Sequence, residues 1–195
     1  MKCQCFEKEL EMIKNDEIRE DCKTLISLLP DYFFLIPASS TGKYHPDFAL
    51  GDGGLVRHTK VAVRIAYDIL NLEFSSDNFS DVEKDLIIMT LILHDGFKSG
   101  FPQEQYTRKD HPLIVGDFVL SNKDKIMMSD DHLDMVISML KSHMGEWNKD
   151  RTWKEVLPKP IEKRERFVHM CDYLSSRQYL DVKFDKDNNL IIGRY

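Results

Sequence analysis

The chain has few cysteines, and their positions argue against a protein held together by disulfide bonds. Its 195 residues include 4 cysteines, at positions 3, 5, 22 and 171, and this scatter does not suggest a disulfide framework. Cys3 and Cys5 stand too close together for the usual zinc spacing, and no matching second pair follows them. We therefore expect ordinary reduced thiols.

The chain also lacks long apolar runs and an excess of basic residues. No uninterrupted apolar run reaches the ~18 residues that span a bilayer, and residues 1–8 lack the apolar stretch of a signal peptide. The net charge of -6 argues against non-specific wrapping of nucleic acid, although bound metal ions can supply positive charge for a nucleotide. We expect a cytoplasmic protein without a membrane partner, in which residues 1–195 form one domain.

Helical periodicity dominates what is present, and no repeat or low-complexity tract interrupts it. Helices are predicted at about residues 7–29, 55–70, 81–93, 112–120, 129–140 and 161–177. Pro30 ends the first helix, and Asp81 is expected to cap the third. The intervening segment 31–54 is long, and a loop of that length is often functional. The tail alternates in polarity, so the fold class is all-α with a small β-hairpin at about residues 179–195.

The most informative feature is the pair His94-Asp95, which closes the apolar run from Leu86 to Leu93. Aspartate is rarely buried without a partner, and histidine needs a partner for each ring nitrogen. A metal ion at the end of this buried segment would satisfy both residues. Further candidate ligands lie on separate amphipathic segments, at His58, His111, His143 and Asp172. Side chains of these types, if they converge, would hold one or two divalent metals.

Each candidate has an ordinary structural explanation when it is taken alone. A single inward-facing histidine is more often a hydrogen-bonded core residue than a metal ligand. Asp172 alone could cap a helix or pair with Arg166 or Lys163. Joint occurrence on successive helices favours the metal site, because several buried polar groups without partners would be costly.

The order of these residues resembles the HD-domain metal-dependent phosphohydrolase superfamily. Its pattern is a histidine, an adjacent His-Asp pair and a distal aspartate, which here correspond to His58, His94-Asp95 and Asp172. Lys98 completes His-Asp-x-x-Lys, a form found in many members. The segment Gly53–Thr59 looks like the one around the first ligand in the phosphodiesterase and exoribonuclease branch. The resemblance implies an all-helical bundle with the metals at its centre.

The resemblance covers about residues 37–177 and also implies the ligand assignment. One metal would be held by His58, His94, Asp95 and Asp172. Asp95 would bridge to a second metal, completed by His111 and His143. Many two-metal members have paired histidines at the fourth ligand position, whereas His143 is followed by Met144, so the second metal is expected to bind more weakly or to be completed differently.

Imidazole and carboxylate ligands suit Mn, Fe, Ni, Co or Zn better than Mg, so we expect one or two divalent transition metals. Such metals activate water for attack on phosphorus, and Asp95 and Lys98 are the expected catalytic side chains. The expected substrate-binding residues are cationic or aromatic, namely Lys43, Tyr44, Arg57 and Arg108. An exposed lysine and a purely structural loop are the alternatives for Lys98 and for residues 37–46.

The leading hypothesis is hydrolysis of a phosphodiester in a nucleotide or in single-stranded nucleic acid. The acidic chain favours small substrates, so a nucleotide phosphomonoesterase resembling a 5′-nucleotidase is the close alternative. The residues after the dyad, Gly96-Phe97-Lys98-Ser99, lack the Glu-Asp pair of the alarmone-hydrolase branch. A non-catalytic nucleotide sensor and a helical interaction module with core histidines are the other hypotheses.

Overall fold

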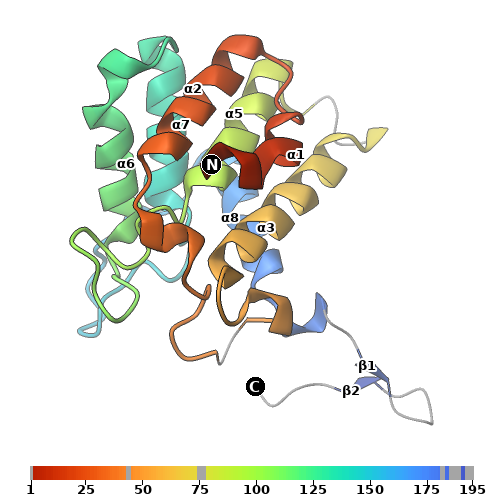
Figure 1. Ribbon diagram of the computed structural model, residues 1–195, viewed down its shortest axis with the longest axis vertical. Helices are drawn as coiled ribbons and strands as arrows, with labels where there is room; N and C mark the ends of the chain where they lie inside the picture. The colour runs from red at the N-terminus through yellow and green to blue at the C-terminus, as the bar shows by residue number, and fades with distance from the viewer. Residues whose placement is uncertain (1, 43–44, 74–77, 181–182, 185–189, 192–195) are drawn as a thin grey trace.

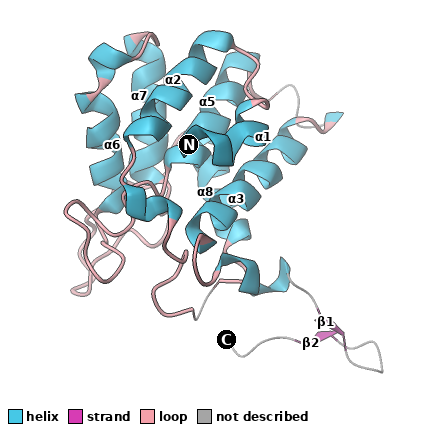
Figure 2. Cartoon of the chain, viewed as in Figure 1, coloured by secondary structure: helices cyan, strands magenta, loops and turns pink. Residues whose placement is uncertain are grey.

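The computed structural model describes residues 2–42, 45–73, 78–180, 183–184 and 190–191, and the regular secondary structure of this part is almost entirely helical (Figures 1 and 2). The α-helices are α1 (Glu7–Leu10), α2 (Asp16–Leu28), α3 (Gly54–Leu70), α5 (Asp81–Leu93), α6 (His111–Ser121), α7 (Asp130–Ser142) and α8 (Lys163–Ser175). Short 3-10 helices are η1 (Lys2–Phe6), η2 (Asp31–Phe34), η3 (Asp47–Ala49), η4 (Lys123–Lys125) and η5 (Gln178–Leu180). The predicted all-α fold is confirmed. Within the described ranges, no helix has both the length and the hydrophobicity that crossing a membrane requires.

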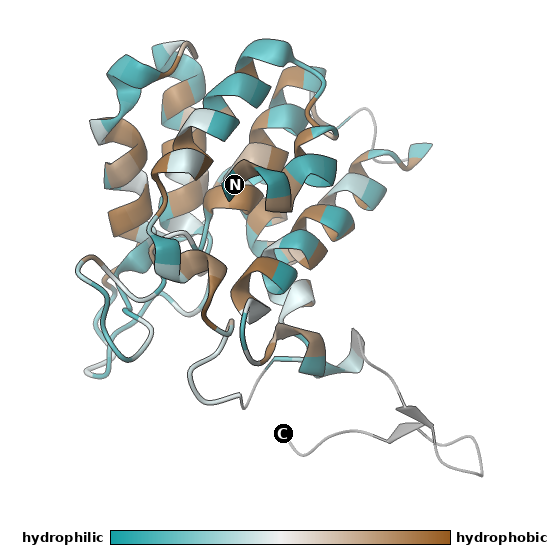
Figure 3. Ribbon diagram, viewed as in Figure 1, coloured by the Kyte–Doolittle hydropathy of each residue, from teal (hydrophilic) through white to brown (hydrophobic). Residues whose placement is uncertain are grey.

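Helix α5 is the centre around which the other helices pack. Its residues from Asp85 to Leu93 are all buried, and it contacts α2, α3, α7 and α8. By contrast, α3 alternates between hydrophobic and hydrophilic residues, as expected of a helix with one face on the core (Figure 3). Enclosure on all sides explains why the second half of α5, from Leu86 to Leu93, is apolar at every position except Thr90. It also places His94 and Asp95, which directly follow the helix, inside the protein.

The predicted single helix over residues 7–29 is wrong, because the chain forms α1 and α2 with a break before Asn15. The side chain of Asn15 accepts a hydrogen bond of 3.1 Å from the backbone N–H of Ile18 and so begins α2. The buried carboxylate of Asp85 accepts hydrogen bonds from the backbone N–H groups of Lys14 and Asn15, at 3.0 and 2.7 Å. These two amides bond to a distant side chain, and the helix is interrupted there.

Helix α5 begins after Ser80, so the prediction that Asp81 caps it is also wrong. Ser80 Oγ accepts from the backbone N–H of Glu83 at 3.2 Å, and the Glu83 carboxylate accepts from the backbone N–H of Ser80 at 2.9 Å. This reciprocal pair satisfies two helix-terminal N–H groups. Asp81 lies in the first turn, where its negative charge is favourable next to the helix N-terminus.

A short strand pairing lies near the end of the chain. β1 (Lys183–Phe184) pairs in antiparallel fashion with β2 (Leu190–Ile191). Residues 185–189, which join the two strands, lie outside the described residues. The hairpin predicted at about residues 179–195 therefore stays a prediction beyond this pairing.

Replacing Asp85 with asparagine is expected to lower the free energy of unfolding by about 2–3 kcal/mol. An amide offers one acceptor oxygen, so one of the two N–H groups, that of Lys14 or that of Asn15, loses its partner in the protein. Urea denaturation measures the loss. Asp81→Asn is the control, because that side chain is 80% exposed and its 3.8 Å contact with Lys84 contributes little. Equal losses in the two variants would contradict the prediction.

Candidate metal centre

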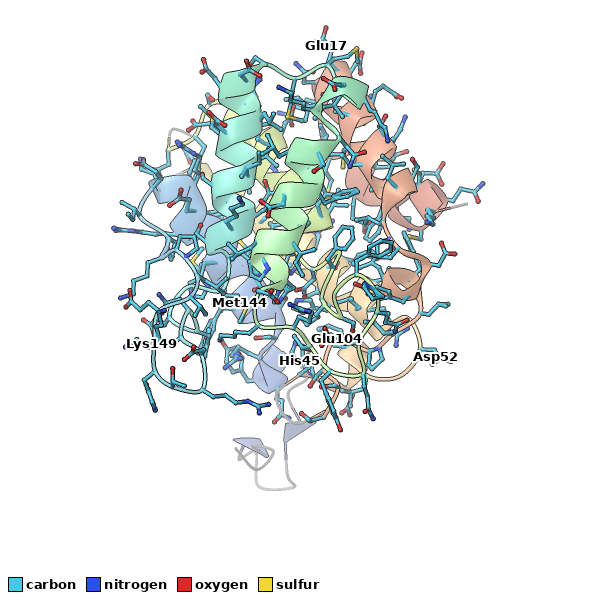
Figure 4. All side chains as sticks on the ribbon, turned by 90° about the vertical axis from the view of Figure 1, so that its left-hand side faces the viewer. Glu17, His45, Asp52, Glu104, Met144 and Lys149 are labelled. Atoms are coloured by element: carbon cyan, nitrogen blue, oxygen red, sulfur yellow. The ribbon has the colours of Figure 1, made fainter. Side chains whose placement is uncertain are left out.

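The six predicted ligands converge at the inner end of α5. They come from α3 (His58), the turn after α5 (His94 and Asp95), the start of α6 (His111), the end of α7 (His143) and α8 (Asp172). In Figure 4 this end of the bundle lies below, near the labelled Met144 and His45 and away from Glu17. The four histidines and Asp95 are buried, whereas the side chain of Asp172 is 18% exposed.

The first group of ligands surrounds one point between α3, α5 and α8. His58 Nε2 lies 3.0 Å from Asp172 Oδ1 and 3.7 Å from Asp95 Oδ2. His94 Nε2 lies 3.4 Å from each of the same two oxygens. Two imidazole nitrogens and two carboxylate oxygens are thus close enough to share one ion, and this donor set suits a transition metal.

The second group uses the other oxygen of Asp95. Asp95 Oδ1 lies 3.1 Å from His111 Nε2 and 3.9 Å from His143 Nε2. The two imidazole nitrogens lie 3.1 Å apart. Asp95 therefore belongs to both groups and presents one oxygen to each, as a bridging carboxylate does.

Backbone carbonyls orient three of the four rings. The Nδ1 atoms of His94, His111 and His143 each bond to the carbonyl three residues earlier in the chain, at 2.6, 2.7 and 2.7 Å. A carbonyl can only accept, so each Nδ1 carries the proton of the neutral ring. Each Nε2 then presents a lone pair to the centre, which is the form of histidine that binds metals.

Ser175 orients the fourth ring, and sequence reasoning missed this residue. Its hydroxyl donates to the backbone carbonyl of Asp172 at 2.8 Å, so its oxygen accepts from His58 Nδ1 at 3.1 Å. His58 Nε2 is therefore also directed at the centre as an acceptor. The available signal was spacing, because Ser175 lies one helical turn after Asp172.

The residues fit a divalent metal, and two features of their arrangement are unfavourable unless a cation is bound. In the described part of the chain, His94 Nε2 is buried and has no hydrogen-bond partner. The lone pairs of His111 Nε2 and His143 Nε2 face each other across 3.1 Å. Buried acceptors without a donor are costly, and a cation between these nitrogens would satisfy them.

The electrostatics also favour positive charge at the first group. Although burial lowers it, the carboxylates of Asp95 and Asp172 raise the pKa of His94 to about 10. Burial raises the pKa of Asp95, but Lys98 and His94 outweigh this effect and hold it well below its usual range. Burial lowers the pKa of His143 to about 3, so this ring is neutral. A proton on His94 or a metal ion balances the charge of the carboxylates.

Lys98, the second predicted catalytic residue beside Asp95, also lies at the centre. Its Nζ is 2.5 Å from Asp95 Oδ2, the oxygen that faces the first group. The guanidinium of Arg57 donates to backbone carbonyls of the loop before α3, and that of Arg108 pairs with Glu104 and Asp110. Contact of either arginine with substrate stays a prediction.

Two predicted substrate-binding residues, Lys43 and Tyr44, lie outside the described residues. The neighbouring His45 is described, and its ring lies edge-to-face on that of His58, with 5.2 Å between centroids. Burial, and next the charge of Lys98, lowers the pKa of His45 to about 3. Sequence reasoning gave His45 no functional role, because a loop residue shows no periodicity from which its direction can be inferred.

The comparison with known families agrees with this geometry. The family described as HD domain matches residues 55–177, which include every predicted ligand from His58 to Asp172. No curated protein and no solved structure matches the chain. Since the family match covers more than half of the sequence and the ligands it contains converge on one centre, the chain belongs to the HD domain family.

Proposed function

We propose that the chain hydrolyses a phosphodiester in a nucleotide or in single-stranded nucleic acid. HD domains are in general metal-dependent phosphohydrolases. The observation that carries the proposal is the position of Asp95, which offers Oδ2 to one histidine group and Oδ1 to the other. Two ions that share a carboxylate suit the in-line displacement of a phosphoester.

The side chains of the centre bind and orient the reacting groups. Bound metals, for which Mn, Fe, Ni, Co and Zn suit these ligands best, would supply an activated water and positive charge for the phosphate. Asp95 and the four oriented histidines hold their acceptor atoms toward the centre without further rearrangement. Lys98 places an ammonium group beside Asp95, where it is suited to bind a phosphate oxygen as negative charge develops.

An aromatic stack between the loop that follows His143 and the helix that carries Asp172 supports a substrate that contains a nucleobase. The rings of Trp147 and Tyr173 stack with 5.5 Å between centroids and 15° between planes. The guanidinium of Arg177 lies 4.2 Å from the centre of the Tyr173 ring, which directly follows Asp172 in α8. Trp147 remains 46% exposed, so part of its surface is open to a base.

A nucleotide phosphomonoesterase is the second candidate. The net charge of -6 and the engagement of Arg57 and Arg108 by protein groups favour a small substrate over a long polynucleotide. The two candidates share the metal centre and differ in the substrate, whose phosphate carries one organic group in a monoester and two in a diester.

The test uses purified protein loaded with Mn, Co or Ni. Its activity is measured on two kinds of substrate, bis(4-nitrophenyl) phosphate and mononucleotides. We expect metal-dependent release of 4-nitrophenolate from the diester. Release of phosphate from mononucleotides alone would support the second candidate. If neither reaction occurs with any of the metals, both candidates fail. In that case, a nucleotide that raises the melting temperature of the protein without being consumed would indicate a nucleotide sensor.

A further inference from the structure

Among the described histidines at or next to the centre, His45 is the one whose Nδ1 lacks a hydrogen-bond partner. Its Nδ1 is buried and makes no hydrogen bond. By contrast, Nδ1 of His94, His111 and His143 bonds to backbone carbonyls, as does Nδ1 of His169. Buried polar atoms without partners are rare, because each costs free energy, and a bound ligand is a common explanation.

His45 does not belong to the ligand set itself. Among the described residues, the two clusters of potential metal ligands comprise His58, His94, Asp95, His111 and His143, and Asp172 joins the first through its 3.0 Å contact with His58 Nε2. His45 is in neither cluster and has no such contact with Asp95 or Asp172. The edge-to-face packing of His45 on His58 sets it beside a ligand instead. The ring thus lines the surroundings of the metals, where a group bound to them would lie.

The loop that carries His45 reaches the centre from outside the helical bundle. It joins α2 to α3, and His45 lies just before η3. Figure 4 labels His45 at the same end of the bundle as Met144, the residue after His143, and Glu104. A long loop over a buried polar centre is a common position for substrate contacts, because the helices are committed to packing.

We propose that His45 binds the phosphoryl group of the substrate by donating one N–H hydrogen bond to a phosphate oxygen. This inference rests on the proposed function, since it assigns the substrate's phosphate to the space beside His58. A phosphate oxygen is an anionic acceptor and forms strong hydrogen bonds, so it is the partner that the ring lacks. Lys98 supplies a second donor at the same centre, next to Asp95 Oδ2.

The test measures binding of inorganic phosphate to Mn-loaded protein by calorimetry, alongside kcat and KM for the best substrate. His45→Phe keeps an aromatic ring but removes the donor. It is expected to weaken phosphate binding about tenfold and to raise KM more than it lowers kcat, with unchanged metal content. Asparagine places an amide N–H near the position of Nδ1, and glutamine places one near Nε2. One of these two variants is expected to retain the affinity for phosphate and so to identify the donating nitrogen.

Several results would overturn the inference. Wild-type affinity for phosphate in His45→Phe would show that the ring only packs. If phosphate binding weakens equally in the Phe, Asn and Gln variants, the effect is also due to packing. If any of these variants loses metal, His45 is a metal ligand. Phosphate binding that depends on His45 in a protein that hydrolyses no phosphoester would sustain this inference while the proposed function fails.

Discussion

Asp95→Asn is expected to empty both metal positions and to lower phosphoester hydrolysis by about a thousandfold or more, beyond the effect of changing an outer-shell partner. Asp95 is the one residue that both ligand groups share. An asparagine offers one neutral oxygen in place of two charged ones, so the second group loses its carboxylate and the first group keeps only that of Asp172. With the charge of Asp95 removed, less negative charge would remain near His94 to favour a proton or a metal ion there.

The metal content of protein purified without chelators checks this expectation. Wild-type protein should carry one or two equivalents of transition metal, and Asp95→Asn should carry almost none. Asp117→Asn is a suitable control, because its side chain is 65% exposed and contacts Lys141 at the surface. Melting curves of all three proteins establish that they fold. If the Asp95→Asn protein retains its metal, Asp95 does not act as a bridging carboxylate.

The ligands were predictable because each is tied to a helix whose buried face can be read from the sequence. The apolar run of α5 places His94 and Asp95 at its inner end, and helical spacing directs His58 and His143 inward in the same way. Such periodicity depends on local sequence alone. The convergence of these faces then follows from the packing of the helices around α5.

The errors arise where distant residues determine local structure. Asp85, 70 positions away in the sequence, accepts a hydrogen bond from the backbone amide of Asn15, where the first predicted helix is divided. No local sequence pattern predicts this contact. The sequence also could not reveal that the guanidinium of Arg57 donates to loop carbonyls, because these partners are backbone atoms; its contact with substrate stays a prediction. His45 and Ser175 were missed for a similar reason, since their partners depend on how separate segments pack.

The two metal positions should also be separable by changing ligands that belong to one group each. His143→Gln leaves His58, His94 and Asp172 in place, so it is expected to retain one equivalent of metal while hydrolysis falls at least about a hundredfold. The second group has three ligands, Asp95, His111 and His143, and the chain has Met144 where a further histidine would strengthen it. The position that is lost should therefore be the weaker of the two.

Calorimetric titration of chelator-treated protein with Mn distinguishes the two positions. The wild-type isotherm is expected to contain a tighter and a weaker site, and His143→Gln should lose the weaker one. Asp172→Asn is the complementary change and should weaken the tighter site, because Asp172 Oδ1 contacts the nitrogens of the first group only. His132→Gln, in the first turn of the same helix α7, controls for replacing a histidine away from the centre. Loss of both sites in His143→Gln would mean that the histidines and Asp95 act as one cluster around a single ion, and hydrolysis would then have to proceed without a second metal.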